Sequence, residues 1–237
     1  MSNKLVLIEH KEIAQGTVEV VFQKPAAFTY LAGQNINLKL AELKYEDPKG
    51  PRRTFTLASA PCEETLFIAT RMTGSGYKKT LVELAAGTEC EYIGPQGKFI
   101  FDSKVKKAVL LAGGIGITPF RSMLREAQQN NALPETLLIY SNANLAGTAF
   151  HNLFIKIADE NASFQYVPIL TNLTADDPWA GERRLMSMAL IQEIVPDWLQ
   201  ATFFLCGSPP MVTAMTEQLQ QAGILPANIR SESLWGY

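Results

Sequence analysis

The sequence predicts a β plus α/β fold, in which an N-terminal antiparallel β-barrel precedes a doubly wound parallel α/β domain. Over the first hundred residues, apolar side chains alternate with polar ones in short runs separated by glycine and proline. After a charged stretch at residues 102–107, apolar strands alternate with amphipathic helices, a pattern typical of a parallel sheet. We therefore place the two domains at residues 1–101 and 107–237.

The barrel half contains several predicted strands and one helix. Alternation with period two marks the first two strands, around Val20 and around Leu38. Further strands are predicted at Thr54–Ser59, Leu66–Arg71 and Cys90–Ile93. A short helix is predicted over Tyr77–Ala85, ended by Gly87. Many short strands without long helices between them favour a small barrel.

The second half alternates strands with helices. Strands are predicted at Ala108–Leu111, Leu137–Tyr140, Phe164–Leu170, Phe203–Cys206 and Ile229–Leu234. Helices are predicted at Pro119–Gln129, Gly147–Ala158, Leu185–Ile194 and Pro210–Ala222, and the last is followed by a capping glycine, Gly223. In a doubly wound sheet, ligands bind beyond the carboxyl ends of the strands.

Composition argues against several classes of function. The net charge of -2 is spread evenly and no block of like charge occurs, so nucleic acid is not expected as a partner. Three distant cysteines and two histidines predict neither a disulfide framework, nor an iron–sulfur cluster, nor another metal site. The first apolar run stops at Glu9, and no run is long enough to span a membrane. We expect a cytoplasmic protein without a signal peptide or membrane insertion.

A glycine-rich turn follows the strand at Ala108–Leu111. Gly113, Gly114 and Gly116 leave room for backbone N–H groups to approach a ligand, and Thr118 is predicted to cap the next helix. An anion such as a pyrophosphate would be stabilised there. The alternative is a turn whose glycines serve packing alone.

Two other segments carry side chains suited to cofactor chemistry. Cys206 and Gly207 end a strand that should lie beside the glycine turn, although a buried cysteine is often only a small apolar residue. In the barrel, the strand Arg53–Thr56 offers a guanidinium for a phosphate, a ring for a flat heterocycle and hydroxyls for a ring nitrogen. Alternation puts Arg53 and Phe55 on one face of this strand. The alternative is an ordinary edge strand with a surface arginine.

Taken together and in this order, these segments resemble the ferredoxin-NADP reductase superfamily over nearly the whole chain. Members look like R-x-Y-[ST]-x-x-S, then G-G-x-G-x-x-P, then C-G-x-P-x-M, then a terminal E-x-F-x-G-Y. The corresponding segments here are Arg53–Ser59, Gly113–Pro119, Cys206–Met211 and Glu232–Tyr237. The resemblance implies a FAD-binding barrel, a nicotinamide-binding α/β domain, and a single-chain form without an iron–sulfur module.

The resemblance also implies which residues contact each cofactor. Those implied for FAD are Arg53, Ser75, Tyr77 and Lys78 at the phosphates, Phe55 against the isoalloxazine, Thr56 at its reactive nitrogen, and Thr54 on the same strand. Those implied for the nicotinamide dinucleotide are Gly113, Gly114, Gly116, Thr118, Cys206 and Gly207. Cys206 and Glu232 would border the hydride path, so the implied catalytic residues are Thr56, Cys206 and Glu232.

Three departures from the family pattern matter. Phe55 replaces the usual Tyr and keeps only the ring. Leu234 replaces the terminal Phe, so the aromatic cover of the flavin would come from Trp235 or Tyr237. Ala143 stands where members that prefer NADPH often carry an Arg. No Arg or Lys lies between Tyr140 and Phe150, which favours NADH unless the distant Arg183 or Arg184 supplies a phosphate site.

The predicted activity is that of a FAD-dependent NAD(P)H oxidoreductase. Hydride would pass from NADH or NADPH to FAD, and electrons would pass on to a separate acceptor, either a ferredoxin, a flavodoxin or an oxygenase component. An NAD(P)H-dependent reductase of free flavin is the alternative enzyme. A non-catalytic dinucleotide-binding regulatory subunit is the alternative of a different class.

Overall fold

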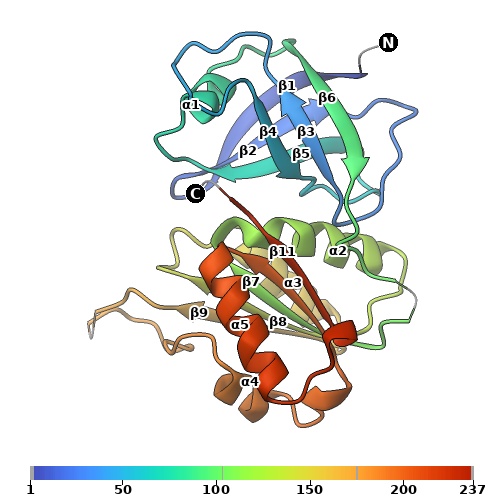
Figure 1. The fold of residues 1–237 in the computed structure, drawn as a ribbon, viewed down its shortest axis with the longest axis vertical. Helices are drawn as coiled ribbons and strands as arrows, with labels where there is room; N and C mark the ends of the chain where they lie inside the picture. The colour runs from blue at the N-terminus through green and yellow to red at the C-terminus, as the bar shows by residue number, and fades with distance from the viewer. Residues whose placement is uncertain (1–2, 103, 175, 236–237) are drawn as a thin grey trace. The chain divides into compact units, whose positions relative to one another are not determined.

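The chain divides into two compact units in the computed structural model, which describes residues 3–102, 104–174 and 176–235. One unit holds the residues up to Ile100 together with Thr118–Glu126. The other holds Phe101–Ile117 and the described residues from Ala127 onward. The first is built on an antiparallel sheet and the second on a parallel sheet, which confirms the predicted fold class (Figure 1).

The sheet of the first unit closes into a barrel. Its strands are β1 (Asn3–Ala14), β2 (Thr17–Gln23), β3 (Asn35–Lys39), β4 (Arg52–Thr56), β5 (Thr65–Arg71) and β6 (Glu89–Gln96), in the order β4-β3-β6-β1-β2-β5. The two edges meet where Leu57, just beyond β4, pairs with Ile68 of β5. Closure of this kind removes the unpaired strand edges that an open sheet would expose.

The strand β1 connects the two halves of the barrel and was not predicted. Asn3–Val6 pair with β6, whereas Leu7–Ala14 pair with β2. Register shifts within β1 let it bend between these partners. Leu5 and Leu7 point into the fully buried core, so the short apolar run near the N-terminus belongs to a strand.

Several element boundaries in the barrel differ from the predicted ones, most of all the ends of β4, α1 and β6, which runs to Gln96 instead of Ile93. β4 ends at Thr56 instead of Ser59, because the chain leaves the β3 edge at Leu57 to close the barrel. The helix α1 (Gly76–Val82) is shorter than predicted, and Gly87 lies in the turn before β6 with a φ of +86°. That turn returns to β1, since the Gly87 N–H donates to the carbonyl of Leu7 at 2.8 Å.

The second unit has a five-stranded parallel sheet. Its strands are β7 (Lys107–Gly113), β8 (Glu135–Asn142), β9 (Phe164–Leu170), β10 (Thr202–Gly207) and β11 (Ile229–Ser233), in the order β11-β10-β7-β8-β9. The chain runs outward from β7 through β8 to β9, and then returns to the other side of β7 as β10. The strand order therefore reverses between β7 and β10, which is where ligands bind in doubly wound folds.

Helices cover this sheet and bury its apolar side chains. The helices α4 (Met188–Ile194) and α5 (Pro209–Gln221) pack in one buried cluster with residues of β7, β8 and β10. The helix α3 (His151–Glu160) lies along β8 and β9, and its Phe154 ring is 6.3 Å from that of Tyr140. Gly223 follows α5 with a φ of +95°, as a C-terminal capping glycine should.

Two of these helices begin later than predicted. α3 begins at His151, because Phe150 adopts a φ of +60° that a continuous helix does not allow. α4 begins at Met188, because the hydroxyl of Ser187 accepts from the N–H of Leu190 at 3.4 Å and so caps the helix.

Candidate functional site

The barrel site is built on β4 and the start of α1. Arg53 and Phe55 lie on one face of β4, as alternation predicts, because both contact the ring of Tyr77. The guanidinium of Arg53 lies 5.0 Å from the centroid of that ring, and the ring of Phe55 lies 6.0 Å from it. The Tyr77 hydroxyl donates to the carbonyl of Leu38 at 3.0 Å, which fixes the ring in place.

Polar groups from separate segments converge beside Tyr77 on one carboxylate, that of Asp47. Its Oδ2 accepts from the Ser75 hydroxyl at 2.7 Å and from the Tyr77 backbone N–H at 2.9 Å. Its Oδ1 accepts from the Lys49 backbone N–H at 3.0 Å and from the Arg53 guanidinium. These donors, the N–H of Tyr77 foremost, hold the pKa of Asp47 well below its usual range.

We call the Arg53 guanidinium, the Ser75 hydroxyl and the Tyr77 N–H the anion cradle. Each of these groups is a common donor to phosphate oxygens, and together they already hold an anion. The donor set therefore fits a phosphate group. Its three residues are among those predicted for FAD, but Asp47 was missed, because an isolated acid in a loop has no periodic signature.

Lys78 adds a positive charge next to the cradle. Its side chain is buried, and its ammonium donates to the carbonyl of Arg71 at 2.9 Å. Burial, together with the nearby charges of Arg53 and Lys49, lowers the pKa of Lys78 to about 8. An added anion would favour the protonated form of this side chain.

The other residues of β4 differ in exposure. Phe55 is 8% exposed and is part of the barrel core, and Thr56 is buried as well. Thr54 is exposed, and its hydroxyl accepts from the side-chain amide of Asn37 at 3.2 Å. Of this strand, Arg53 alone takes part in the anion cradle, through its guanidinium.

The glycine turn of the second unit lies at the switch point between β7 and β10. A Cβ on Gly116 would lie 2.2 Å from the carbonyl oxygen of Cys206 and 2.7 Å from the nitrogen of Gly207. A Cβ on Gly113 or on Gly207 would meet the sulfur of Met211, at 2.8 Å and 2.6 Å. Gly116 is therefore required for the turn to pack against the end of β10, whereas a side chain at Gly113 or Gly207 would require the flexible Met211 side chain to move.

The close packing of the glycine turn against the end of β10 also brings the predicted nicotinamide residues together. Cys206 pairs with Ala112 on one side and with Glu232 on the other, so Cys206 lies beside the glycine turn. Cys206 is fully buried, and burial, followed by the charge of Glu232, raises the pKa of its thiol. Gly114 has a φ of +53°, which favours glycine at that position.

The prediction that Thr118 caps a helix is wrong. One turn of 3₁₀ helix at Gly114–Ile117 leads directly into α2 (Thr118–Gln129), so Thr118 is already inside helical structure. Helical structure therefore begins five residues earlier than the predicted start at Pro119, at Gly114, next to the strand end.

The predicted flavin cover falls at the end of the described chain. Trp235 follows β11 and is 81% exposed, and the N–H of the preceding Leu234 donates to the carbonyl of Gly207 at 2.9 Å. Tyr237 lies outside the described residues. The role of these aromatics stays a prediction.

The distant arginines considered for a 2′-phosphate are engaged elsewhere. Arg183 donates to the carbonyls of Thr174, Asp177 and Trp179 at 2.8–2.9 Å. Arg184 pairs with Glu182 at 2.8 Å and with Glu193 at 2.9 Å. Both are used to hold the segment before α4 in place.

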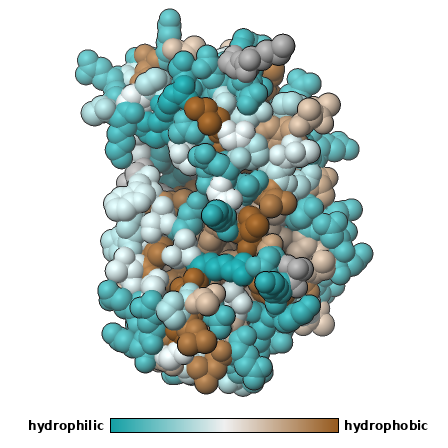
Figure 2. Space-filling view, turned by 45° about the vertical axis from the view of Figure 1, so that its right-hand side comes forward, coloured by the Kyte–Doolittle hydropathy of each residue, from teal (hydrophilic) through white to brown (hydrophobic). Residues whose placement is uncertain are grey.

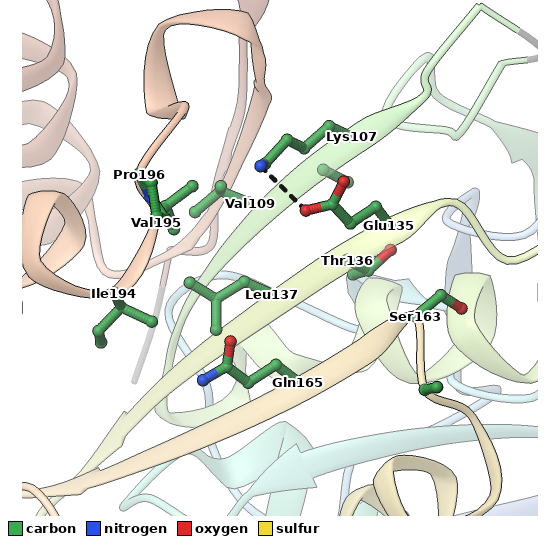
Figure 3. Close-up of a pocket in the computed structure, with 12 residues that line it drawn as sticks. Lys107, Val109, Glu135, Thr136, Leu137, Ser163, Gln165, Ile194, Val195 and Pro196 are labelled. Carbon is green, nitrogen blue, oxygen red and sulfur yellow. Dashed lines mark ion pairs between the residues drawn. The ribbon is translucent and has the colours of Figure 1, made fainter.

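A cavity of about 140 Å³ lies at the amino ends of the strands of the parallel sheet, where β7, β8 and β9 begin (Figure 3). At its rim, Lys107 forms ion pairs with Glu135 at 2.9 Å and with Asp197 at 3.3 Å. Because its charges are paired and it lies away from the carboxyl ends of the strands, this cavity is not the candidate site.

No group of His, Cys, Asp and Glu in the described ranges could hold a metal ion. Over the same part of the chain, no helix is long and apolar enough to cross a membrane.

Comparison with known proteins gives matches in both units. Residues 110–217 match the family model described as the oxidoreductase NAD-binding domain, a range that includes Gly113 and Cys206. The glycine betaine monooxygenase reductase subunit of Chromohalobacter salexigens is 28% identical over 215 residues, which cover 89% of this chain and 57% of that protein. The chain thus spans little more than half the length of such curated relatives.

Solved structures share the fold of almost the entire chain. A cytochrome P450 reductase of Amycolatopsis superposes with a TM-score of 0.82 at 25% identity, over 98% of this chain and 69% of that one. A ferredoxin NADP+ reductase from Neisseria gonorrhoeae, with bound FAD and NADP, superposes with a TM-score of 0.80 at 18% identity over 98% of both chains. Over both of its units the chain is therefore similar to reductases of the ferredoxin-NADP reductase superfamily.

Proposed function

We propose that this protein is a FAD-dependent NAD(P)H oxidoreductase that passes electrons to a separate acceptor. The observation that carries the proposal is the presence of two prepared sites with different chemistry. One is the anion cradle of the barrel, and the other is the glycine turn at the switch point of the parallel sheet. Relatives and structural neighbours named as reductases support the same assignment.

In the barrel, Arg53, Ser75 and Tyr77 would bind the FAD phosphates, with Lys78 adding charge. Phe55 and Thr56 would border the isoalloxazine, although both are buried in the described conformation. When bound, FAD supplies the capacity to accept a hydride and to release electrons singly or in pairs. The chain supplies orientation and excludes water.

In the second unit, the glycine turn would hold the nicotinamide dinucleotide against the end of β10. Cys206 and Glu232 occupy adjacent strands at that end, which is the basis for assigning them to the hydride path. Cys206 would contribute as a buried neutral thiol that shapes the site, because burial disfavours the thiolate.

The acceptor that we propose is a redox protein, either an oxygenase component, a ferredoxin or a flavodoxin. One relative is named as the reductase subunit of a monooxygenase, one structural neighbour as a cytochrome P450 reductase, and another as a ferredoxin NADP+ reductase. On the surface seen in Figure 2, hydrophobic side chains occur in small groups between hydrophilic ones, which suits a transient polar contact. The three unpaired cysteines favour a reducing compartment such as the cytoplasm.

The visible spectrum of the purified protein, before and after anaerobic NADH, tests the proposal. A yellow protein with a flavin spectrum that NADH bleaches is the expected result. A colourless protein that reduces added free flavin would support the alternative enzyme. A colourless protein that binds NADH without turnover would support a regulatory subunit and overturn the proposal.

The barrel site has its own test. Arg53→Ala should weaken FAD retention by about 1.5–3 kcal/mol, because it removes a charge-assisted phosphate contact. Retention is measured as the FAD-to-protein ratio after dialysis. Arg52→Ala is the matched control, since Arg52 is exposed and donates only to Asn37, at 3.4 Å, among the bonds described for it. Full retention in Arg53→Ala would show that Arg53 does not hold the phosphates.

A further inference from the structure

The anion cradle is occupied by a group of the chain itself. The side chain of Asp47 is only 5% exposed and accepts four hydrogen bonds. Two come from the cradle's Ser75 and Tyr77, and one comes from its Arg53. A carboxylate and a phosphate use such donors in the same way, so both cannot fill the same positions at once.

Arg53 is held by the same loop through its other nitrogen. Its Nη1 donates to the carbonyls of Lys49 at 3.1 Å, Gly50 at 2.9 Å and Arg52 at 2.6 Å. Its Nη2 donates to Asp47. Both terminal nitrogens therefore serve residues 47–52, and the N–H groups that make these bonds can contact a phosphate only if some of these acceptors are exchanged.

The charge around Asp47 favours a more strongly charged anion. Arg53 pairs with the carboxylate, and the charges of Arg53 and Lys49 both act on Lys78. One carboxylate leaves these three cations under-compensated, whereas a pyrophosphate diester carries two negative charges. The exchange of one anion for the other is therefore electrostatically reasonable.

Besides the hydrogen bonds of Asp47 and Arg53, the segment that carries Asp47 is held by the partly buried Leu43 and by contacts with α1, where a Cβ on Gly76 would lie 2.2 Å from the carbonyl oxygen of Glu46. We call residues 41–51 the strap. The Lys44 N–H donates to the Thr80 hydroxyl at 3.0 Å, and Lys44 and Tyr45 both bond the exposed Glu83. Gly50 adopts a φ of +67° with open space around it, which suits a hinge at that end of the strap.

We propose that Asp47 is an internal ligand of the anion cradle, and that a phosphate of the dinucleotide displaces its carboxylate when it binds. The inference rests on the proposed function, because it takes the FAD phosphates as the incoming group. No covalent bond changes: Asp47 moves into solvent with the strap, and the phosphate takes over the donors of Arg53, Ser75 and Tyr77. The strap thus competes with the cofactor.

The test uses the full chain freed of FAD, with binding followed by flavin fluorescence. Asp47→Asn should bind FAD about tenfold or more tightly than the unaltered protein, because the competing charge is gone. Glu46→Gln, an exposed acid of the same strap, is the matched control and should change nothing. Weaker binding in Asp47→Asn would mean that Asp47 supports Arg53 in the bound state, and the inference would be wrong.

The rate of binding tests the same inference on the unaltered chain, in case the variant does not fold. If the strap must open first, the observed rate should level off as FAD concentration rises. A rate that rises linearly to high concentration would contradict the strap's opening.

Inorganic phosphate separates this inference from the proposed function. At constant ionic strength, phosphate should raise the melting temperature of Asp47→Asn more than that of the unaltered FAD-free protein. If phosphate acts in this way but FAD does not bind, the cradle stands and the assignment to FAD fails. If FAD binds but phosphate stabilises both proteins equally, displacement of Asp47 is refuted.

Discussion

Lys78 is a cation whose charge depends on pH near the physiological range. Its pKa is lowered to about 8, mainly by burial, whereas the ordinary value is 10.5. Between these values the unfolded chain binds the proton and the folded chain does not, so this group's contribution to stability rises with pH over that window. The affinity of the neighbouring cradle for an anion has the opposite dependence on pH, because only the protonated form of Lys78 attracts the anion.

We therefore expect FAD to bind more weakly at pH 9 than at pH 7. Fluorescence titration of the FAD-free protein at the two pH values measures the difference. Lys78→Met should remove most of the pH dependence, while Lys79→Met, which alters an exposed neighbour, should retain it. Equal affinity at both pH values would show that Lys78 does not act on the cofactor.

Cys206 presents a second question at the residue scale, because its burial is compatible with a purely structural role. We expect Cys206→Ala to slow reduction of the bound flavin by NADH about tenfold, or ~1.4 kcal/mol in the barrier. Stopped-flow absorbance measures this rate, with Cys62→Ala as the control for an exposed thiol. An unchanged rate with normal FAD content would leave Cys206 as a packing residue.

At the scale of elements, the first turns of α2 are tied to the loop that follows β4. Arg121 makes a two-pronged contact with Glu63 and donates to the carbonyl of Ala58 at 3.2 Å. Ser122 donates to the carbonyl of Ser59 at 2.6 Å. Burial raises the pKa of Glu63, but the hydrogen bond and charge of Arg121 lower it more, so the net shift is downward.

Glu63→Ala should destabilise the protein by about 2 kcal/mol, because Arg121 would be left buried without its main anion. The value is below that of a fully buried pair, since Glu63 keeps some contact with solvent. Urea denaturation measures it, and the exposed neighbour Glu64→Ala should stay within about 0.5 kcal/mol of the unaltered protein. Because the folded-state pKa of Glu63 is lowered, its contribution should be lost as pH falls below about 4.5.

Periodicity predicts elements well where one pattern governs the whole segment. β9 has the predicted bounds, Phe164–Leu170, and α5 differs from its prediction by one residue at each end. β1 was missed because its two halves pair with different strands. The start of α3 was misplaced because the backbone of Phe150, which the apolar spacing does not reveal, ends the preceding turn.

The residues of the candidate sites were likewise predictable only where a regular pattern of the fold places them. Gly113, Gly116 and Cys206 were predictable because the order of strands in a doubly wound sheet brings particular strand ends together. Asp47 and Glu63 were not, because each is an acid in a loop whose partner lies elsewhere in the sequence. Sequence order alone carries no information about such pairs.

At the scale of the whole molecule, the choice between NADH and NADPH depends on cations from several segments. A 2′-phosphate needs a cation near the end of β8, and that position holds the exposed methyl group of Ala143. Arg183 is bound to backbone carbonyls, and Arg184 to two glutamates. A third candidate, Arg121, is bound to Glu63.

We therefore expect kcat/KM to be at least about tenfold higher for NADH than for NADPH, which corresponds to ~1.4 kcal/mol. Ala143→Arg should narrow this ratio by improving the use of NADPH, since a guanidinium there could contact the extra phosphate. Ala146→Arg places the same charge at another exposed position of the loop and should leave the ratio unchanged. A preference of the unaltered protein for NADPH would contradict the prediction. It would mean that Arg183 or Arg184 gives up its present partners when the dinucleotide binds. The segment before α4, which these contacts hold in place, would then be loosened.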